Sequence, residues 1–503
     1  MRTAQLGEAH LPFAFCSLRR NTISTSTTGS KPKLIRGIGL LQAASLNMSN
    51  MVGIGPFITI PIFLAEMEGP QAMLGWIVGA MIAISDGMVW SELGAAMPGS
   101  GGTYVYLREA FKLTPLSRLM PFLFIWQFIW SGPLEIASGN IGFASYLSYL
   151  WPGLNHAFFS HSFSLPLLSF QFEWTLTGGN LVAVGVGLLA VIILYRGITS
   201  IARIGVVLWA GMLLTVAWVI VSGILHMDMS RAFSFPPGAF TLNRGFWIGL
   251  GGAMLIAMYD YLGYYNICYL GDEVREPERT IPRAVIISVI AVAAIYLTMN
   301  TSLVGVLPWQ QVVEWQKSSA PEAKFVFAIF MENIYGRAAA TLLTVMILWT
   351  AFASIFALML GYSRIPFAAA VDGYFFKSFA RLHPRAGFPY ISLLVVGALA
   401  CLASLANLSA VISAAITVRI IVQFIGQIVA VSLLRRAYPD SWRPFKMWLY
   451  PLPSLIAFAG WSYVFITSGP QFIIAGLATI AVGAVLYFIW SRKVKVAEAS
   501  GAN

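Results

Sequence analysis

The sequence predicts an all-α integral membrane protein with twelve transmembrane helices. The 503 residues are 58% apolar and only 10% charged, a composition that fits no soluble class. Twelve apolar runs are long enough to cross the hydrocarbon core, which requires about 20 residues each. The first and sixth runs are interrupted near their midpoints by glycine-containing segments, at 53–56 and at 261–263. Together these observations define the fold class.

The twelve predicted spans follow one another along the chain from the first run to the last. Each is a run of mainly apolar residues flanked by charged or polar connections. In order, the spans cover 37–62, 69–95, 119–150, 179–196, 201–225, 245–270, 284–307, 338–363, 390–407, 410–434, 447–468 and 471–490.

Lysine and arginine positions predict the orientation. Twenty-five of the 31 basic residues fall in the tail and alternate loops on one side, five fall on the other side, and Arg419 lies inside the tenth span. The positive-inside rule therefore predicts a multi-pass protein of the plasma (cytoplasmic) membrane with both termini in the cytoplasm. The net charge of +11 follows from this topology, so we expect the lipid bilayer, and not nucleic acid, as the partner.

Residues 1–33 are predicted to form a disordered cytoplasmic tail. They contain Arg19-Arg20 and a polar run at 21–30. The weakly apolar stretch at 11–15 is too short and too interrupted for the hydrophobic region of a secretory signal. Residues 34–495 are predicted to form a single transmembrane domain.

The two interrupted helices predict an inverted repeat. Five spans separate the start of the first from the start of the sixth, so the sixth enters the membrane from the opposite face. The halves are then inverted five-helix repeats, at 34–226 and 244–436, with helices 11 and 12 appended at 447–491. Lipid offers no water to freed backbone groups, so paired breaks at matching positions indicate a transport site. A packing kink would explain one break but not the pair.

The breaks have opposite polarity. Pro56 suits the first turn of a helix, so the second half of span one would present free amides of Ile54, Gly55 and Phe57 at the midplane. That end suits a carboxylate. The half-helix ending near Tyr259 would present carbonyls, which suit an ammonium group. An α-amino acid carries both charges.

Four short motifs, in the right order over about residues 35–490, resemble those of the amino acid, polyamine and organocation permeases. Each matches a helix break or a loop of that family. They are Val52–Phe57, Glu92-Leu93 with Pro98–Tyr104, Gly271–Arg283, and Arg364–Gly373 with Phe379–Pro384.

The resemblance implies a leucine-transporter-type fold, with discontinuous helices 1 and 6 binding the substrate. It implies an aromatic residue that closes over the substrate, here Tyr259. Ile54 and Pro56 depart from the family pattern and remove two donors from its carboxylate site. Gly55–Phe57 also resembles the polyamine-uptake branch. The matching substrate-binding residues are Gly53, Ile54, Gly55, Phe57, Tyr259, Asp260, Tyr261 and Gly263.

Charged groups inside the spans are candidates for substrate binding or ion coupling, because each is costly in lipid. Asp260 lies in the second break, where it could hold a substrate amine or a proton, or cap freed amides. Glu135 and Asp86 resemble acids of the polyamine-uptake branch, which has a further acid where this chain has Tyr265. Arg419 could instead pair with either acid, which would make that acid structural. We expect coupling through Asp260, Glu135 or Asp86.

The coupling ion is expected to be the proton. Some proton-coupled relatives carry a lysine in the fifth helix, where this chain has Met212, so coupling through that lysine is absent. First-helix carbonyls and Ser354 could supply oxygen ligands for sodium, which is a weaker signal. No cofactor is expected beyond a transmembrane ion gradient.

The pattern predicts a secondary active permease that imports amino acids by alternating access. No catalytic residues or metal ligands stand out, so an enzyme is not expected. A polyamine or cationic amino acid proton symporter is the main alternative, since Pro56 removes a donor and Asp260 adds a negative charge. A non-transporting nutrient sensor is more remote, because the chain ends soon after the last span. A channel would need a polar pore, which the spans lack.

Overall fold

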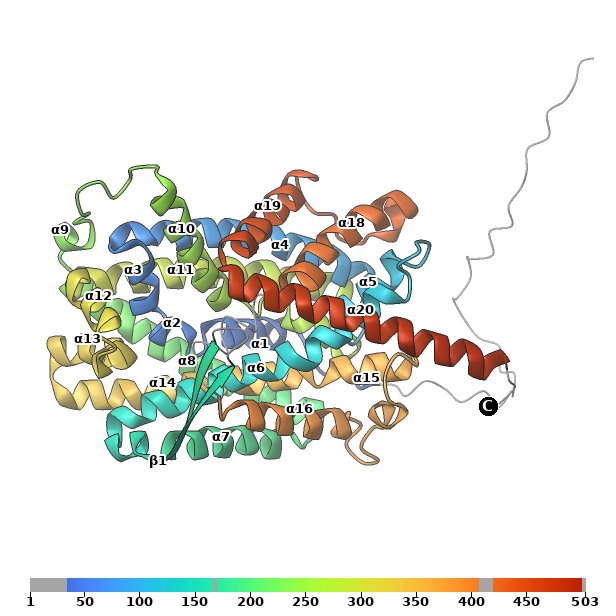
Figure 1. Ribbon diagram of the computed structural model, residues 1–503, viewed down its shortest axis with the longest axis horizontal. Coiled ribbons are helices and arrows are strands. Elements are labelled where there is room, and N and C mark those ends of the chain that lie inside the picture. The colour runs from blue at the N-terminus through green and yellow to red at the C-terminus, as the bar shows by residue number, and fades with distance from the viewer. Residues whose placement is uncertain (1–33, 166–169, 407–418, 500–503) are drawn as a thin grey trace, which may run out of the picture. The chain divides into compact units, whose positions relative to one another are not determined.

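The computed structural model describes residues 34–165, 170–406 and 419–499. It is mainly helical (Figure 1). The helices up to the midpoint are α1 (Leu40–Val52), α2 (Gly55–Ile58), α3 (Ile60–Met67), α4 (Met73–Ala96), α5 (Thr103–Ala110), α6 (Leu119–Leu150), α7 (Gly178–Leu194), α8 (Ile198–His226), α9 (Met229–Ala232) and α10 (Arg244–Tyr261).

The second half continues the helical pattern. Its helices are α11 (Pro277–Val306), α12 (Trp309–Lys317), α13 (Val326–Tyr335), α14 (Arg337–Tyr362), α15 (Arg364–Val371), α16 (Tyr390–Ala403), α18 (Gly426–Ala437), α19 (Leu452–Thr467) and α20 (Pro470–Ala499). A π-helix, η8 (Ile420–Ile425), precedes α18. Single 3-10 turns include η4 (Asn266–Tyr269), η5 (Gly271–Glu273) and η6 (Pro321–Phe325).

Seven helices in the described residues are long and apolar enough to cross a membrane, or eight if the bent pair at 40–67 is one span. Three shorter apolar helices, α7, α16 and α19, coincide with predicted spans, and α10 covers the first part of the predicted sixth span. The twelve-span count therefore stays a prediction. The start of the predicted tenth span and the predicted tail at 1–33 lie outside the described residues.

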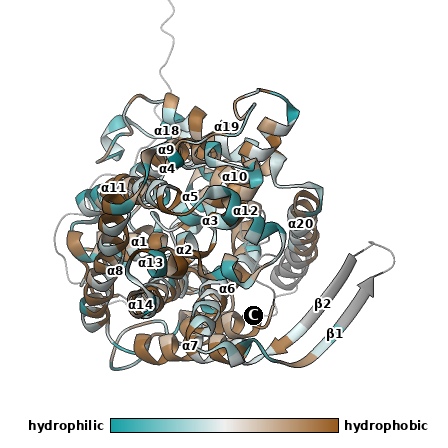
Figure 2. Cartoon of the chain, turned by 90° about the vertical axis from the view of Figure 1, so that its left-hand side faces the viewer, coloured by the Kyte–Doolittle hydropathy of each residue, from teal (hydrophilic) through white to brown (hydrophobic). Residues whose placement is uncertain are grey.

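Apolar side chains surround the bundle. The ribbons of α7, α8 and α14 are coloured mainly as hydrophobic in Figure 2. Large apolar residues such as Leu189, Leu214 and Val345 are exposed on these helices, as expected for lipid-facing surfaces. Helix α20 runs along the edge of the bundle, and the most apolar part of it is only 11% buried (Figures 1 and 2).

The expectation of an all-α fold is wrong between the third and fourth spans. Strands β1 (Ala157–Leu165) and β2 (Phe170–Thr177) pair antiparallel there. The segment Phe159–Leu165 alternates aromatic or apolar residues with polar ones, a period of two that is typical of a strand. The sequence therefore carries a strand signal that the membrane-helix interpretation does not take into account.

The first helix is broken twice. Gly53 ends α1, and a second bend of 63° lies between Ile58 and Ile60. Pro61 causes the second bend, because it lacks the N–H that would bond to the carbonyl of Phe57. That carbonyl instead accepts a hydrogen bond from the Tyr146 hydroxyl at 3.0 Å. The half-helix predicted after Pro56 is therefore two short helices, α2 and α3.

Buried ion pairs join the elements at the end of the bundle that is predicted to be cytoplasmic. Arg364 binds Glu273 through two bonds of 2.9–3.0 Å, and both side chains are 1% exposed. The backbone oxygen of Glu273 accepts from the amides of Gly37 and Ile38, at the start of the first helix. Arg435 likewise binds Glu92. These contacts join α15, η5 and the segment just before α1 at this end of the bundle.

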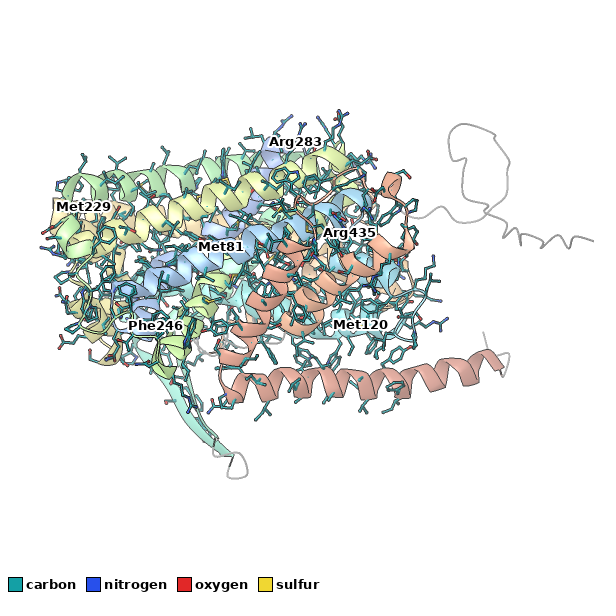
Figure 3. All side chains as sticks on the ribbon, turned by 90° about the horizontal axis from the view of Figure 1, so that it is seen from above. Met81, Met120, Met229, Phe246, Arg283 and Arg435 are labelled. Carbon is teal, nitrogen blue, oxygen red and sulfur yellow. The ribbon has the colours of Figure 1, made fainter. Side chains whose placement is uncertain are left out.

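Labelled residues separate along the bundle as the topology predicts. Arg283 and Arg435, assigned to the cytoplasmic side, lie in the right-hand part of Figure 3, and Met229 and Phe246 lie at the left. The separation is consistent with the predicted sidedness. Which end faces the cytoplasm remains a prediction.

Candidate functional site

A small cavity lies where the two breaks meet. It has a volume of about 30 Å³, and one water needs about 10–15 Å³. An amino acid is much larger than the few waters this space admits, so the site would have to expand to bind one. The lining residues are Asn50, Met51, Gly53, Ile54, Gly55, Glu135, Ser138, Gly139, Tyr259, Asp260, Leu262, Ser354 and Leu358.

The first break brings backbone close to α14 and α6. A β-carbon at Gly53 would lie 2.7 Å from Ser354 Oγ, so only glycine permits this approach. The side chain of Ile54 packs against Gly142 of α6. Within the described residues the amides of Ile54 and Gly55 have no hydrogen-bond acceptor. The prediction of a free Phe57 amide is wrong, because it donates to the Ile54 carbonyl at 3.1 Å and so closes the first turn of α2.

The Asp260 carboxylate joins the two breaks. Its Oδ2 accepts a 2.6 Å hydrogen bond from Thr59 Oγ1, at the second bend of the first helix. Its Oδ1 lies against Gly55, where a β-carbon would overlap it. Asp260 is only 2% exposed, and Oδ1 has no hydrogen-bond partner among the described residues. An unpaired acceptor on a buried acid is costly unless a ligand or a proton supplies the missing partner.

The half-helix before the second break ends two residues later than predicted, at Tyr261 and not near Tyr259, so Asp260 lies in the last turn of α10 and not in the break itself. The amide of Leu262 donates to the carbonyls of Met258 and Tyr259, and Gly263 then adopts a φ of +119°. Helix α10 starts at the N-cap Asn243, whose side chain accepts from the Phe246 amide. After the break the chain continues as the 3-10 turns η4 and η5, not as a regular helix.

Tyr296 of α11 bridges the ends of the two half-helices. Its hydroxyl lies 2.6 Å from the Met51 carbonyl oxygen and 2.9 Å from the Asp260 carbonyl oxygen, within donating distance of both. Asn47 makes a second bridge. Its Nδ2 donates to the Tyr264 carbonyl at 2.6 Å, and its Oδ1 accepts from the Ile267 amide at 2.9 Å. These bonds replace the backbone pairs that the breaks remove.

Glu135 reaches the cavity from α6 and is paired. Its Oε2 binds Arg419 Nη1 and accepts from the Tyr362 hydroxyl at 2.6 Å. The guanidinium lies over the Tyr362 ring, 5.2 Å from its centroid. Both charged side chains are buried, and the opposite charge of each offsets much of the cost of burying the other. Of the two partners that the sequence allowed for Arg419, the structure selects Glu135.

Tyr259 and Asp86 lie in different surroundings. The Tyr259 ring lines the cavity, and its hydroxyl is 2.5 Å from Ser138 Oγ of α6. Asp86 lies outside the lining, in an aromatic cluster. Its Oδ2 accepts from Tyr264 and Trp90, and Oδ1 has no partner in the described part of the chain. Tyr265 belongs to the same cluster and stacks on Trp90, with 4.4 Å between the ring centroids.

The structure brings most of the predicted site residues together. Gly53, Ile54, Gly55, Tyr259 and Asp260 line one cavity with Glu135. Three predicted residues lie outside the lining. Phe57 packs on Phe327, the hydroxyl of Tyr261 donates to the Trp76 carbonyl, and Gly263 packs against Asn50.

Other lining residues had little or no signal in the sequence. Asn50 and Ser138 are small polar residues in apolar helices and resemble ordinary packing residues there. The sequence indicates Ser354 only as an oxygen ligand for sodium. Its hydroxyl donates to the Asn50 carbonyl at 3.1 Å.

A larger cavity of about 610 Å³ lies towards the end that is predicted to be external. It is lined by residues of α2, α3, α6, α7 and η6, including Ile58, Ile62, Ser145, Asn180 and Lys324. Ile58 belongs to the turn that also contains Gly55, so the short helix α2 contributes to both cavities.

Known proteins resemble the chain over nearly its whole length. Residues 38–490 match a family described as amino acid permease. A branched-chain amino acid permease of Bacillus subtilis is 23% identical, over 93% of this chain and 95% of the relative. A serine/threonine exchanger of Bacillus subtilis is 25% identical, over 86% and 90%. Cationic amino acid transporter 4 of Mus musculus is 24% identical, over 85% of this chain and 64% of the relative.

Proposed function

We propose a transport function from one premise: the chain belongs to the amino acid permease family, whose match spans residues 38–490. Its relatives are transporters and not enzymes. The proposed function is secondary active import of amino acids by alternating access, with the cavity between the two breaks as the substrate site.

One observation links the proposed transport function to the small cavity. One cavity is lined by the first break, with the free amides of Ile54 and Gly55, and by the last turn of α10, with the unpaired Asp260 oxygen. Donors from one helix and a negative charge from the other complement the carboxylate and the ammonium group of an amino acid. Because the volume is only about 30 Å³, the cavity must expand to admit an amino acid.

Proton coupling is proposed at Asp260. The neighbouring acid, Glu135, already has Arg419 as its counter-ion, and Asp86 is outside the cavity. Asp260 has no basic partner in the described residues and lies beside the proposed amine position. Its protonation and the binding of a substrate amine are therefore linked equilibria, and this linkage would couple transport to the proton gradient.

A cationic amino acid or polyamine is the second candidate. Two carboxylates, Asp260 and Glu135, line the cavity, while Lys324 is the basic residue at the larger one. A cationic amino acid transporter is among the relatives. Release of Arg419 from Glu135 would leave two acids for a substrate with two amines.

Uptake into proteoliposomes separates the candidates. The purified chain is supplied with labelled leucine, serine, arginine and putrescine, with and without an inward proton gradient. We expect the gradient to drive accumulation of at least one zwitterionic amino acid. Accumulation of putrescine without any zwitterionic amino acid would reject the first proposal in favour of the second.

A further inference from the structure

Asn50 lies beside Asp260 in the lining of the small cavity. It is in the last turn of α1, three residues before Gly53, and its side chain is 6% exposed. Its backbone carbonyl is used by Ser354, but its side-chain Nδ2 has no acceptor among the described residues. A buried amide donor without a partner costs about 1–3 kcal/mol in proteins generally, so it requires an explanation.

Comparison with Asn47 shows that this is not a general property of amides at the break. Asn47 lies one turn earlier on the same face of α1 and is fully buried. Both ends of its side chain bond to backbone after the second break, to Tyr264 and to Ile267. Asn47 is therefore a structural residue, whereas the donor of Asn50 remains available beside a cavity.

Gly263 of the second break leaves room for the Asn50 amide. A β-carbon at Gly263 would lie 2.6 Å from Asn50 Cγ and 2.7 Å from Nδ2. The positive φ of Gly263 also disfavours any other residue there. Because Gly263 has no side chain, the side-chain amide of Asn50 can occupy this position. This gives Gly263 a role at the site although it does not line the cavity.

The two unpaired groups are chemically complementary. Asp260 Oδ1 is an acceptor with negative charge, and Asn50 Nδ2 is a neutral donor. Both line the same cavity, and both side chains are more than nine-tenths buried. A ligand that satisfies both must present an ammonium group to one and an oxygen acceptor to the other. A zwitterionic α-amino acid does so, whereas a simple diamine leaves the Asn50 donor unpaired.

We propose that Asn50 is a specificity-determining residue that donates to the substrate carboxylate and so selects amino acids over amines without a carboxylate. This inference rests on the proposed transport function and adds a residue to its site. The side chain acts in two ways. It stabilises the carboxylate of the correct substrate, and it leaves a buried donor unpaired when a diamine binds.

Isosteric replacement tests the proposal. Asn50→Asp replaces the donor with an acidic acceptor at nearly constant shape, and Asn50→Ala removes the donor without adding charge. Affinities of the purified full-length protein for leucine, serine, arginine and putrescine are measured by scintillation proximity binding. We expect both variants to bind the preferred amino acid about tenfold or more weakly than the wild type. Both variants should bind putrescine more tightly than the wild type, because both remove the unpaired donor, and Asn50→Asp should do so by about tenfold or more because it also adds a negative charge.

Failure of this inference differs from failure of the transport proposal. If the wild type binds no amino acid, the transport proposal fails. If the wild type binds one and both Asn50 variants retain its affinity, the role of Asn50 is refuted. Equal putrescine affinity in the wild type and Asn50→Asp also contradicts it. If Asn50→Asp fails to fold, the two single variants Asn50→Ala and Gly263→Ala test the role of Asn50. Gly263→Ala displaces the Asn50 amide and should therefore also weaken amino acid binding.

Discussion

Replacing Gly55 with alanine tests whether the two breaks act as one site. The added β-carbon would overlap Asp260 Oδ1 and would lie 3.2 Å from its Cγ. The Asp260 carboxylate must therefore move away from the first break. Its movement breaks the 2.6 Å hydrogen bond from Thr59 and displaces the charge that is proposed to receive the substrate amine.

The expected size of the effect follows from the charge-assisted hydrogen bond that the substrate amine is proposed to make to Asp260 and would lose. Hydrogen bonds to charged groups contribute about 1.5–3 kcal/mol, and each 1.4 kcal/mol is tenfold in affinity. Gly55→Ala should therefore weaken amino acid binding by roughly ten- to 150-fold. Equilibrium binding of the labelled amino acid to the purified protein measures this.

A matched control comes from α7. No atom lies within 4 Å of a β-carbon at Gly185, which faces outwards from the bundle, so Gly185→Ala should leave affinity unchanged. If Gly55→Ala binds substrate as tightly as Gly185→Ala, the first break is only a packing kink and the assignment of the site fails.

Three further predictions concern residues that connect the breaks or close the bundle. Asp260→Asn keeps the size of the side chain but not its charge, so proteoliposome uptake should no longer respond to a pH gradient, and affinity for the amine group should fall; unchanged uptake and affinity would remove Asp260 from the mechanism. Tyr296→Phe leaves the carbonyls of Met51 and Asp260 without their shared donor and should lower the free energy of unfolding by about 1–3 kcal/mol. Tyr261→Phe, which loses a longer 3.3 Å bond outside the cavity, is its control, and equal melting temperatures would contradict the bridging role. Arg364→Ala leaves Glu273 buried without its partner and should cost about 3–5 kcal/mol of stability, while the double variant with Glu273→Ala should recover part of it. If the double variant unfolds at the same temperature as Arg364→Ala, other contacts hold this end of the bundle together.

The positions of the breaks could be predicted because lipid imposes strict rules on the backbone. Glycine and proline are conspicuous in long apolar runs, so Gly53, Gly55 and Pro56 are enough to locate the first break. Buried acids are conspicuous for the same reason, and Asp260 and Glu135 both reach the cavity. These predictions depend on local sequence alone.

Properties that depend on three-dimensional packing could not be predicted. The sequence allowed Arg419 to pair with Asp86 or Glu135, and only the packing of α6 beside η8 decides between them. The second bend of the first helix was not predicted, because Pro61 has no glycine beside it to mark a break. Asn50 and Asn47 look alike in the sequence, and their roles differ only because Gly263 and η4 lie opposite them.

A structure determined with bound amino acid would show directly whether the two breaks form the substrate site. Ligand density is expected in the cavity between Gly53–Gly55 and Tyr259–Leu262, with the ammonium group at Asp260 and the carboxylate at the Ile54 and Gly55 amides and at Asn50. The cavity should be larger than its present 30 Å³. Density confined to the larger cavity of about 610 Å³, with the small cavity unchanged, would contradict it.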